Sequence, residues 1–270
     1  MATKFPLCRA SVMPKFAANL SFLFTEVPFM ARFAAASAAG FRGVEYLFPY
    51  EEDKQAIAQA LRENSLENVL FNLPPGDWAA GERGLGALPG REQDFRDGVE
   101  KALDYALAAG TTRLHALAGI VPPHADLAEC HDTFIRNLRY ACERLGPHGI
   151  TLLIEPINNR DMPGYFLNYQ QNAHALLEQV GATNLKVQMD FYHAQIMEGD
   201  IISTFRQHLP HIGHVQIASV PDRHEPDLGE LNYPWLFAMM DEAGYDGWIG
   251  CEYRPRQGTT AGLGWMAAYK

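Results

Sequence analysis

The chain has 270 residues, 47% of them hydrophobic and 20% charged, which is enough for one large α/β domain with a substantial buried core. Lysine and arginine number 22 and aspartate and glutamate 32, so the formal net charge is −10. That charge excludes non-specific binding to nucleic acid, which needs a basic field. A small anionic ligand would need a local cluster of positive charge.

Cysteine usage and hydropathy indicate the compartment. Four scattered cysteines without a CxxC pair indicate free thiols, so we expect a cytoplasmic protein. No apolar run approaches the ~20 residues that a membrane span needs. Residues 1–12 lack the apolar core of a signal peptide, so we expect a dispensable leader there and one folded domain over residues 13–270. The sequence leaves a homo-oligomer open.

Apolar, strand-like runs alternate with amphipathic segments along the chain. The expected strands are Phe16–Phe22, Gly43–Leu47, Val69–Asn72, Arg113–Ala118, Thr151–Glu155, Leu185–Asp190, His214–Ile217 and Trp248–Glu252. The expected helices lie near residues 27–39, 51–64, 91–109, 126–145, 170–180, 200–209 and 233–243. In the helix over 91–109, Phe95, Val99, Leu103 and Leu107 recur every four residues and predict one buried stripe.

The order of these elements predicts the fold. Alternating strands and helices indicate a parallel sheet, and eight units in ~250 residues are the size of a closed (β/α)8 barrel. A doubly wound open sheet usually has fewer units. For a dinucleotide-binding protein it would also carry a glycine fingerprint after the first strand, where this chain has Asn19-Leu20-Ser21-Phe22. We therefore predict an α/β fold of one domain, a (β/α)8 TIM barrel.

The connection after the third expected strand, residues 72–91, is rich in glycine and proline and has no helical period. A structureless loop of this length in a compact domain is usually either functional or disordered. Trp78, Leu85 and Leu88 favour an ordered loop that lies over another part of the molecule.

Four oxygen-bearing side chains stand at the ends of the last four expected strands: Glu155, Asp190, Gln216 and Glu252. They are 35, 26 and 36 residues apart, each step close to one strand–helix unit, so they should converge on the active-site face of a barrel. Three carboxylates together repel one another unless they are protonated or neutralised by a cation. A single acid at a strand end is commonly a helix cap, but four in register predict a metal site, for Mg²⁺ first and Mn²⁺ as the alternative.

Three further residues are candidates for contact with a ligand. Glu45 ends the second expected strand and is either a substrate ligand or an acid behind the metal ligands. His115 lies inside the fourth strand and suits a core histidine equally well. His193, three residues after Asp190, is placed to contact substrate, to orient a metal ligand or to cap the next helix.

Arginines at the same end of the barrel predict an anion clamp. Arg223, Arg254 and Arg256 follow the last two expected strands, and arginine binds carboxylates through paired N–H groups. Arg223 is the first candidate for a substrate carboxylate, and Arg83 in the 72–91 loop is another.

Several long segments resemble the hydroxypyruvate isomerase family, including its 2-oxo-tetronate isomerase branch, of the xylose-isomerase-like barrels. They are FAANLSFLFTEVPFMARFAAASAAGF, GVEYLFPY, ALPGRE, PDRHEPDLGELNYPW and GWIGCEYRP. The resemblance runs from about Met13 to Trp265. It implies a divalent metal bound by the four strand-end residues, with Glu155 and Glu252 as the proton donor and acceptor pair.

The resemblance also implies the reaction. A small anionic 2-oxo-3-hydroxy acid would lose a proton to one glutamate, form an enediolate and regain a proton on the neighbouring carbon. Hydroxypyruvate would become tartronate semialdehyde, or 2-dehydrotetronate would become 3-dehydrotetronate. The 72–91 loop would close over the enediolate and exclude water.

Three alternatives are weaker. Endonuclease IV-like DNA repair nucleases share this barrel, and Asp190 with His193 fits part of their pattern, but their multi-zinc site needs histidines where this chain has Asn72 and Gln216. The sugar epimerases of the superfamily, such as ketose 3-epimerases, usually have histidine where this chain has Gln216. A non-catalytic barrel that binds sugar acids would not need both glutamates.

Overall fold

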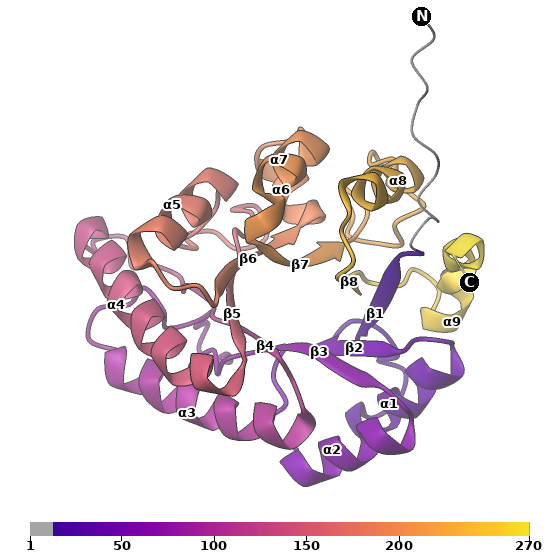
Figure 1. The fold of residues 1–270 in the computed structure, drawn as a ribbon, viewed down its shortest axis with the longest axis horizontal. Coiled ribbons are helices and arrows are strands. Elements are labelled where there is room, and N and C mark those ends of the chain that lie inside the picture. Colours follow the sequence, from indigo (N-terminus) through magenta and orange to yellow (C-terminus); the bar gives the residue numbers. More distant parts are fainter. Residues whose placement is uncertain (1–12, 270) are drawn as a thin grey trace, which may run out of the picture.

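Eight parallel strands close into a barrel in chain order, with the eighth strand paired to the first (Figure 1). The structure is a computed structural model that describes residues 13–269. The strands are β1 (Lys15–Asn19), β2 (Gly43–Tyr46), β3 (Glu67–Asn72), β4 (Arg113–His115), β5 (Thr151–Ile154), β6 (Leu185–Asp190), β7 (Ile212–Ile217) and β8 (Trp248–Cys251). The predicted (β/α)8 TIM barrel is confirmed. The predicted leader, residues 1–12, lies outside the described residues.

Helices form the outer ring of the barrel (Figure 1). They are α1 (Phe29–Ala38), α2 (Lys54–Glu63), α3 (Glu92–Ala109), α4 (Leu127–Leu145), α5 (Gln170–Val180), α6 (Phe191–Met197), α7 (Ile201–His208), α8 (Tyr233–Ala243) and α9 (Thr259–Gly262). Short α6 and α9 were not expected from the sequence. Helix α6 starts directly after β6 because the Asp190 carboxylate accepts a hydrogen bond from the Tyr192 N–H at 2.8 Å. Across residues 13–269, no helix combines the length and hydropathy that crossing a bilayer requires.

The buried stripe of α3 differs from the prediction at one residue. Phe95, Val99 and Leu103 are buried, but Leu107 is 56% exposed. A helix has 3.6 residues per turn, so a four-residue repeat drifts by about 40° at each step and leaves the buried face after three steps. The small side chains of Ala102 and Ala106 continue the buried face instead.

The 72–91 loop is ordered, as predicted, and it is held by the chain that follows β4. Ala87 N–H donates to the Ala118 carbonyl at 2.7 Å, and Leu85 is buried. This pairing explains why β4 ends at His115 rather than at Ala118: the chain after His115 turns away from the barrel to pair with the loop. Gly84 has a φ of 109°, and a Cβ there would lie 2.4 Å from Leu117, so only glycine permits this approach.

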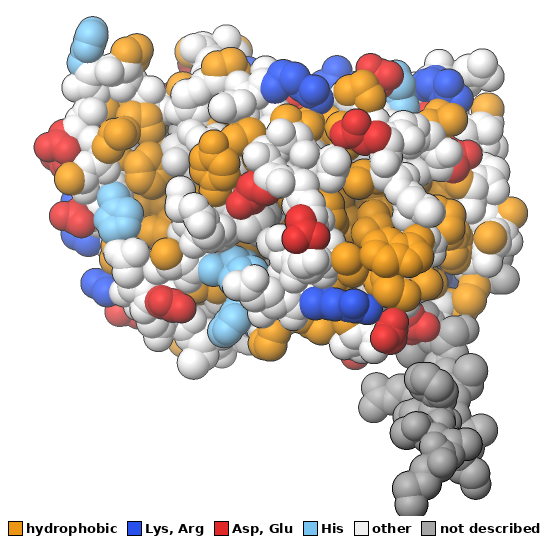
Figure 2. Space-filling view, turned by 90° about the horizontal axis from the view of Figure 1, so that it is seen from above, with side chains coloured by type: hydrophobic (Ala, Val, Ile, Leu, Met, Phe, Trp, Pro, Cys, Tyr) orange, Lys and Arg blue, Asp and Glu red, His pale blue; other side chains and the backbone are white. Residues whose placement is uncertain are grey.

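Histidine side chains gather on the outer face formed by α5, α7 and α8, among acidic and apolar side chains (Figure 2). The His174 ring stacks on the His208 ring with centroids 3.7 Å apart, and His211 lies beside them. Both ring nitrogens of His174 are buried without a hydrogen-bond partner in the described part of the chain. None of these three histidines lines the cavity at the carboxyl ends of the strands.

Candidate functional site

A cavity of about 480 Å³ opens at the carboxyl ends of the strands. Every strand end contributes at least one residue to its lining, among them Asn19, Glu45, Leu70, His115, Glu155, Gln188, Gln216 and Glu252. Glu155 and Glu252 each follow the last residue of their strand by one position, so they stay at the mouth although β5 and β8 are shorter than expected. The sequence-based prediction that these side chains converge matches this geometry.

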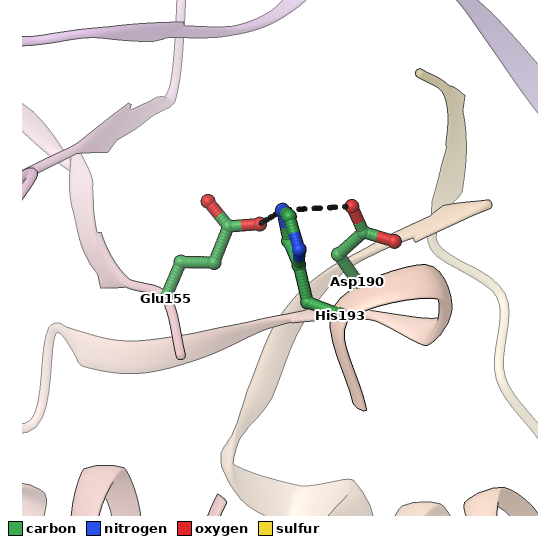
Figure 3. A group of neighbouring side chains, drawn as sticks. All are labelled: Glu155, Asp190 and His193. Atoms are coloured by element: carbon green, nitrogen blue, oxygen red, sulfur yellow. Dashed lines mark ion pairs between the residues drawn. The ribbon is translucent and has the colours of Figure 1, made fainter. Parts of the chain in front are cut away.

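Glu155, Asp190 and His193 form a compact cluster at the wall of this cavity, with both carboxylates turned toward the imidazole (Figure 3). Glu155 and His193 line the cavity, whereas Asp190 is fully buried and is not part of the lining. His193 Nε2 lies 3.6 Å from Asp190 Oδ2 and 4.0 Å from Glu155 Oε1. Those two carboxylate oxygens are buried and have no hydrogen-bond partner among the described residues. Buried, unsatisfied carboxylate oxygens are costly, and a hard divalent cation would satisfy both of them. The cluster therefore fits a metal ion.

The orientation of His193 is set by Asn158. The Asn158 backbone N–H donates to His193 Nδ1 at 3.4 Å, and its side-chain amide nitrogen lies 2.6 Å from the same atom. Because Nδ1 accepts, the proton of the neutral ring is on Nε2, which faces the two carboxylates. Burial, and next the charge of Arg223, lower the pKa of His193, so the ring stays neutral. His193 is thus a hydrogen-bond donor to the cavity.

Arg223 joins two of the acids. Its Nη2 lies 2.5 Å from Glu252 Oε1 and 3.5 Å from Asp190 Oδ2. The guanidinium also packs over the rings of Phe22 and Tyr192, with its carbon 5.1 Å and 4.9 Å from the ring centroids. The first candidate for a substrate carboxylate is therefore already paired with carboxylates of the protein itself.

Gln216 presents its amide nitrogen to Glu252. Nε2 donates to Glu252 Oε2 at 2.5 Å and to Glu45 Oε1 at 2.7 Å, while Oε1 accepts from Gln188 Nε2 at 2.7 Å. All four of the predicted metal ligands thus meet at the mouth, but in two groups. Glu155 and Asp190 have free oxygens, whereas Gln216 and Glu252 are hydrogen-bonded to neighbours.

Burial dominates the electrostatics of the acids. It raises the pKa of Glu252 to about 8 and that of Asp190 to about 6, although Arg223 lowers both. Burial, and next the charges of Glu252 and Asp190, raise the pKa of Glu155 well above its ordinary value. Carboxylates crowded in this way either hold protons or require a cation.

The remaining predicted residues lie at different depths. His115 is buried against Asn72, with Nδ1 3.2 Å from the Asn72 amide oxygen, and burial lowers its pKa to about 3. Glu45 is fully buried at the wall of the cavity, where it accepts a hydrogen bond from Gln216. Arg254 lines the cavity from the outer rim.

The predicted clamp of three arginines is wrong for Arg256. Its side chain is not part of the cavity lining, and its Nε lies 3.6 Å from Glu225 Oε2. After Glu252 the chain leaves the strand, so side-chain directions no longer follow a period. Arg83 from the 72–91 loop does line the cavity.

The sequence analysis missed Asn19, Gln188 and Asn158. Gln188 stands two residues before Asp190 on β6, and residues two apart on a strand share a face, so that spacing could have found it. Asn19 is the last residue of β1, but the expected strand ran on to Phe22, so Asn19 was not recognised as a strand end. Asn158 follows β5 in a loop and carries no sequence signal.

Comparison with known proteins identifies the family. The xylose isomerase-like TIM barrel model matches residues 33–269. The chain belongs to this family. It is 58% identical over 257 residues to a 2-oxo-tetronate isomerase of Cupriavidus necator, covering 95% of this chain and 99% of that protein. It is 49% identical to a hydroxypyruvate isomerase of Escherichia coli, covering 96% and 100%.

A solved structure of the same family gives a close match. The crystal structure of an AP endonuclease, family 2, from Brucella melitensis is 56% identical and superposes with a TM-score of 0.94, covering 96% of this chain and all of that one. The relatives from Cupriavidus necator and Escherichia coli are both named isomerases. The predicted membership of the hydroxypyruvate isomerase group and the predicted isomerase class are confirmed, and the nuclease and epimerase alternatives are not favoured.

Proposed function

We propose that this xylose isomerase-like barrel isomerises small 2-oxo-3-hydroxy acids with the help of a divalent metal. The substrate is a 2-dehydrotetronate, which becomes a 3-dehydrotetronate, or hydroxypyruvate, which becomes tartronate semialdehyde. The observation that carries the proposal is the presence of two buried glutamates, Glu155 and Glu252, in one cavity with a carboxylate cluster suited to a metal. The names of the relatives point to the same reaction.

The proposed metal is Mg²⁺, with Mn²⁺ as the alternative. Its proposed ligands are Glu155, Asp190, Gln216 and Glu252, and the unsatisfied oxygens of Glu155 and Asp190 support this set most directly. A divalent cation bound there would polarise the substrate carbonyl and stabilise negative charge on its oxygen. The donors are hard oxygens, which suits these two ions better than zinc.

Glu155 and Glu252 are the proposed acid and base. One carboxylate takes the proton from the carbon that carries the hydroxyl group, and the electron pair of that C–H bond forms the double bond of the enediolate. The hydroxyl proton passes to the neighbouring oxygen, and a carboxyl group returns a proton to the former carbonyl carbon. The pKa of Glu252, raised to about 8, suits a side chain that must take up and release a proton, and burial raises the pKa of Glu155 in the same direction.

His193 and the arginines complete the proposed substrate site. His193 Nε2–H faces the two carboxylates and would donate to an oxygen of the enediolate. His115 lies beside Glu155, with Nδ1 3.7 Å from Oε2. Since Arg223 is paired with Glu252, we assign the substrate carboxylate to Arg83, with Arg254 at the rim. Arg83 is held in place by stacking on Trp78 at 3.9 Å and by bonds from Nη1 to two backbone carbonyls, which leave its other N–H groups available.

The 72–91 loop is the proposed lid, because Trp78 and Arg83 lie on the cavity side of it. The net charge of −10 supports a small-molecule substrate rather than nucleic acid. A cytoplasmic location is proposed on the free, buried thiols of Cys130, Cys142 and Cys251.

Exchange of substrate hydrogen with solvent tests the function. With Mg²⁺ or Mn²⁺ present, deuterium from D₂O should enter hydroxypyruvate or a 2-oxo-tetronate, as detected by NMR. If neither substrate shows exchange, the proposal is refuted. Nicking of abasic DNA would establish the nuclease instead. Values of kcat/KM on hydroxypyruvate and both tetronate enantiomers then identify the preferred substrate.

A further inference from the structure

A buried acid lies behind the mouth and is not used by the proposed chemistry. Glu45 on β2 is fully buried, and its carboxylate accepts three hydrogen bonds from side chains. His214 Nε2 lies 2.6 Å from Oε2, while Asn19 Nδ2 at 3.0 Å and Gln216 Nε2 at 2.7 Å donate to Oε1. An ionised carboxylate has only acceptors to offer, so three donors match it.

Two of these donors also bind Glu252. Asn19 Nδ2 lies 3.1 Å and Gln216 Nε2 2.5 Å from Glu252 Oε2. Each amide NH₂ group has two hydrogens, so each can give one to Glu45 and one to Glu252. Two parallel amide bridges therefore connect the buried acid to the proposed catalytic one, and they meet on the same oxygen of Glu252.

The barrel wall makes room for this arrangement. A Cβ on Gly250, in strand β8 on the other side of β1, would lie 2.4 Å from both carboxylate oxygens of Glu45. The carboxylate thus occupies the space that a side chain at position 250 would need. On its far side, His214 on β7 is itself fully buried, and stands two residues before Gln216 on the same face of the strand.

We propose that Glu45, anchored by His214, is a positioning residue that fixes Glu252 and Gln216 through the two amide bridges. The carboxylate draws both NH₂ groups toward itself and thereby sets where Oε2 of Glu252 stands. The Glu45 carboxylate also orients the Gln216 amide. With the Gln216 NH₂ group turned to Glu45, the Gln216 carbonyl oxygen points to Gln188. This inference rests on the proposed function, because Glu252 and Gln216 receive their roles from it.

The Glu45→Gln variant tests the inference because it keeps the shape and removes the charge and one acceptor. Partners behind metal ligands typically account for a factor of about 10 to 100 in activity or metal affinity, so kcat should fall by that factor at saturating metal. KM should stay within about threefold, since the proposed function assigns the substrate contacts to other residues. Calorimetric titration of the substrate-free protein with Mn²⁺ should show a dissociation constant raised by roughly tenfold.

Asn68→Ala is the matched control. Asn68 is equally buried and donates to Tyr46 and Thr111, but on the helix-facing side of the sheet, where Tyr46 packs on Phe29 and Phe33. It should lower the melting temperature while leaving kcat and Mn²⁺ affinity unchanged. A loss of kcat in this variant equal to that of Glu45→Gln would overturn the inference, because general destabilisation would then explain both.

The wild-type protein is measured first, so that a wrong function and a wrong inference give different results. If the wild type shows no exchange, the proposed function fails. If it is active and Glu45→Gln keeps its kcat within about twofold, or keeps its Mn²⁺ affinity, the positioning role is refuted. If the Glu45→Gln variant does not fold, Asn19→Ala takes its place. This variant removes one amide bridge and leaves Glu45 intact, and we expect it to lower kcat roughly three- to tenfold. An unchanged kcat in Asn19→Ala would equally refute the role.

Discussion

The two proposed catalytic glutamates should respond differently to the same substitution. Glu252 accepts from three N–H donors, namely Arg223 on one oxygen and Gln216 and Asn19 on the other. In Glu252→Gln, an NH₂ group replaces one of the two accepting oxygens, and at either position it meets an N–H donor instead of an acceptor. At least one buried donor then loses its acceptor, at a cost of about 1–3 kcal/mol. Glu155 has one oxygen without any hydrogen-bond partner among residues 13–269, and His193 Nε2 lies 4.0 Å from it, beyond hydrogen-bond distance. Glu155→Gln therefore removes a crowded charge without breaking a hydrogen bond to that oxygen.

Both variants should lose activity, because removal of a general acid or base costs a factor of about 10²–10⁴. Their thermal stability should separate them. In EDTA, Glu155→Gln should melt at or above the wild-type temperature, whereas Glu252→Gln should melt lower by roughly 2–4 °C for each kcal/mol lost. Deuterium exchange and circular-dichroism melts on the two proteins measure this directly. Near wild-type exchange in either variant would disprove the two-glutamate mechanism, and equal melting temperatures would disprove the hydrogen-bond argument.

Three further predictions concern charge. Burial, and next His208 and His211, lower the pKa of His174 to about 3. The unfolded chain therefore binds its proton first, and stability falls as pH drops below about 6.5, by at most ~1.4 kcal/mol per pH unit for the one proton involved. His174→Gln should lessen this loss in melts between about pH 7 and 5. Arg83→Ala should raise KM for hydroxypyruvate about 10-fold or more with little change in kcat, and an unchanged KM would reassign the carboxylate to Arg254. EDTA should abolish exchange and Mg²⁺ or Mn²⁺ should restore it, whereas full activity in the chelated protein would exclude the metal.

The sequence was sufficient to predict the barrel and the ring of residues at its mouth. Strand–helix alternation sets the topology, and spacings close to one unit place Glu155, Asp190, Gln216 and Glu252 at neighbouring strand ends regardless of exact strand lengths. The ends of β5 and β8 were misplaced by one residue without consequence, because the first residue after a strand still lies at the mouth.

The contacts within the mouth could not be predicted in the same way. The amide bridges from Glu45 to Glu252 join β2 to β8, which are far apart in the chain and meet only because the barrel closes. Arg223 pairs with Glu252 and Asp190 from a loop with a positive φ of 57°, a backbone conformation that no periodic pattern encodes. The position of Arg256 was wrong because Arg256 also lies in a loop, between β8 and α9, where side-chain directions follow no period.

The charges at the mouth explain why the substrate carboxylate needs an arginine other than Arg223. Glu155, Asp190 and Glu252 are buried together, and Arg223 is the cation that the structure places among them. Three carboxylates and one guanidinium, all ionised, leave two negative charges, which is the charge that one divalent cation would balance. Arg223 is therefore required to balance the protein's own acids, and the carboxylate of the substrate needs a further positive group. In the proposed function Arg83, which lines the cavity and stacks on Trp78, would supply that charge in a protein whose overall charge of −10 would otherwise repel the ligand.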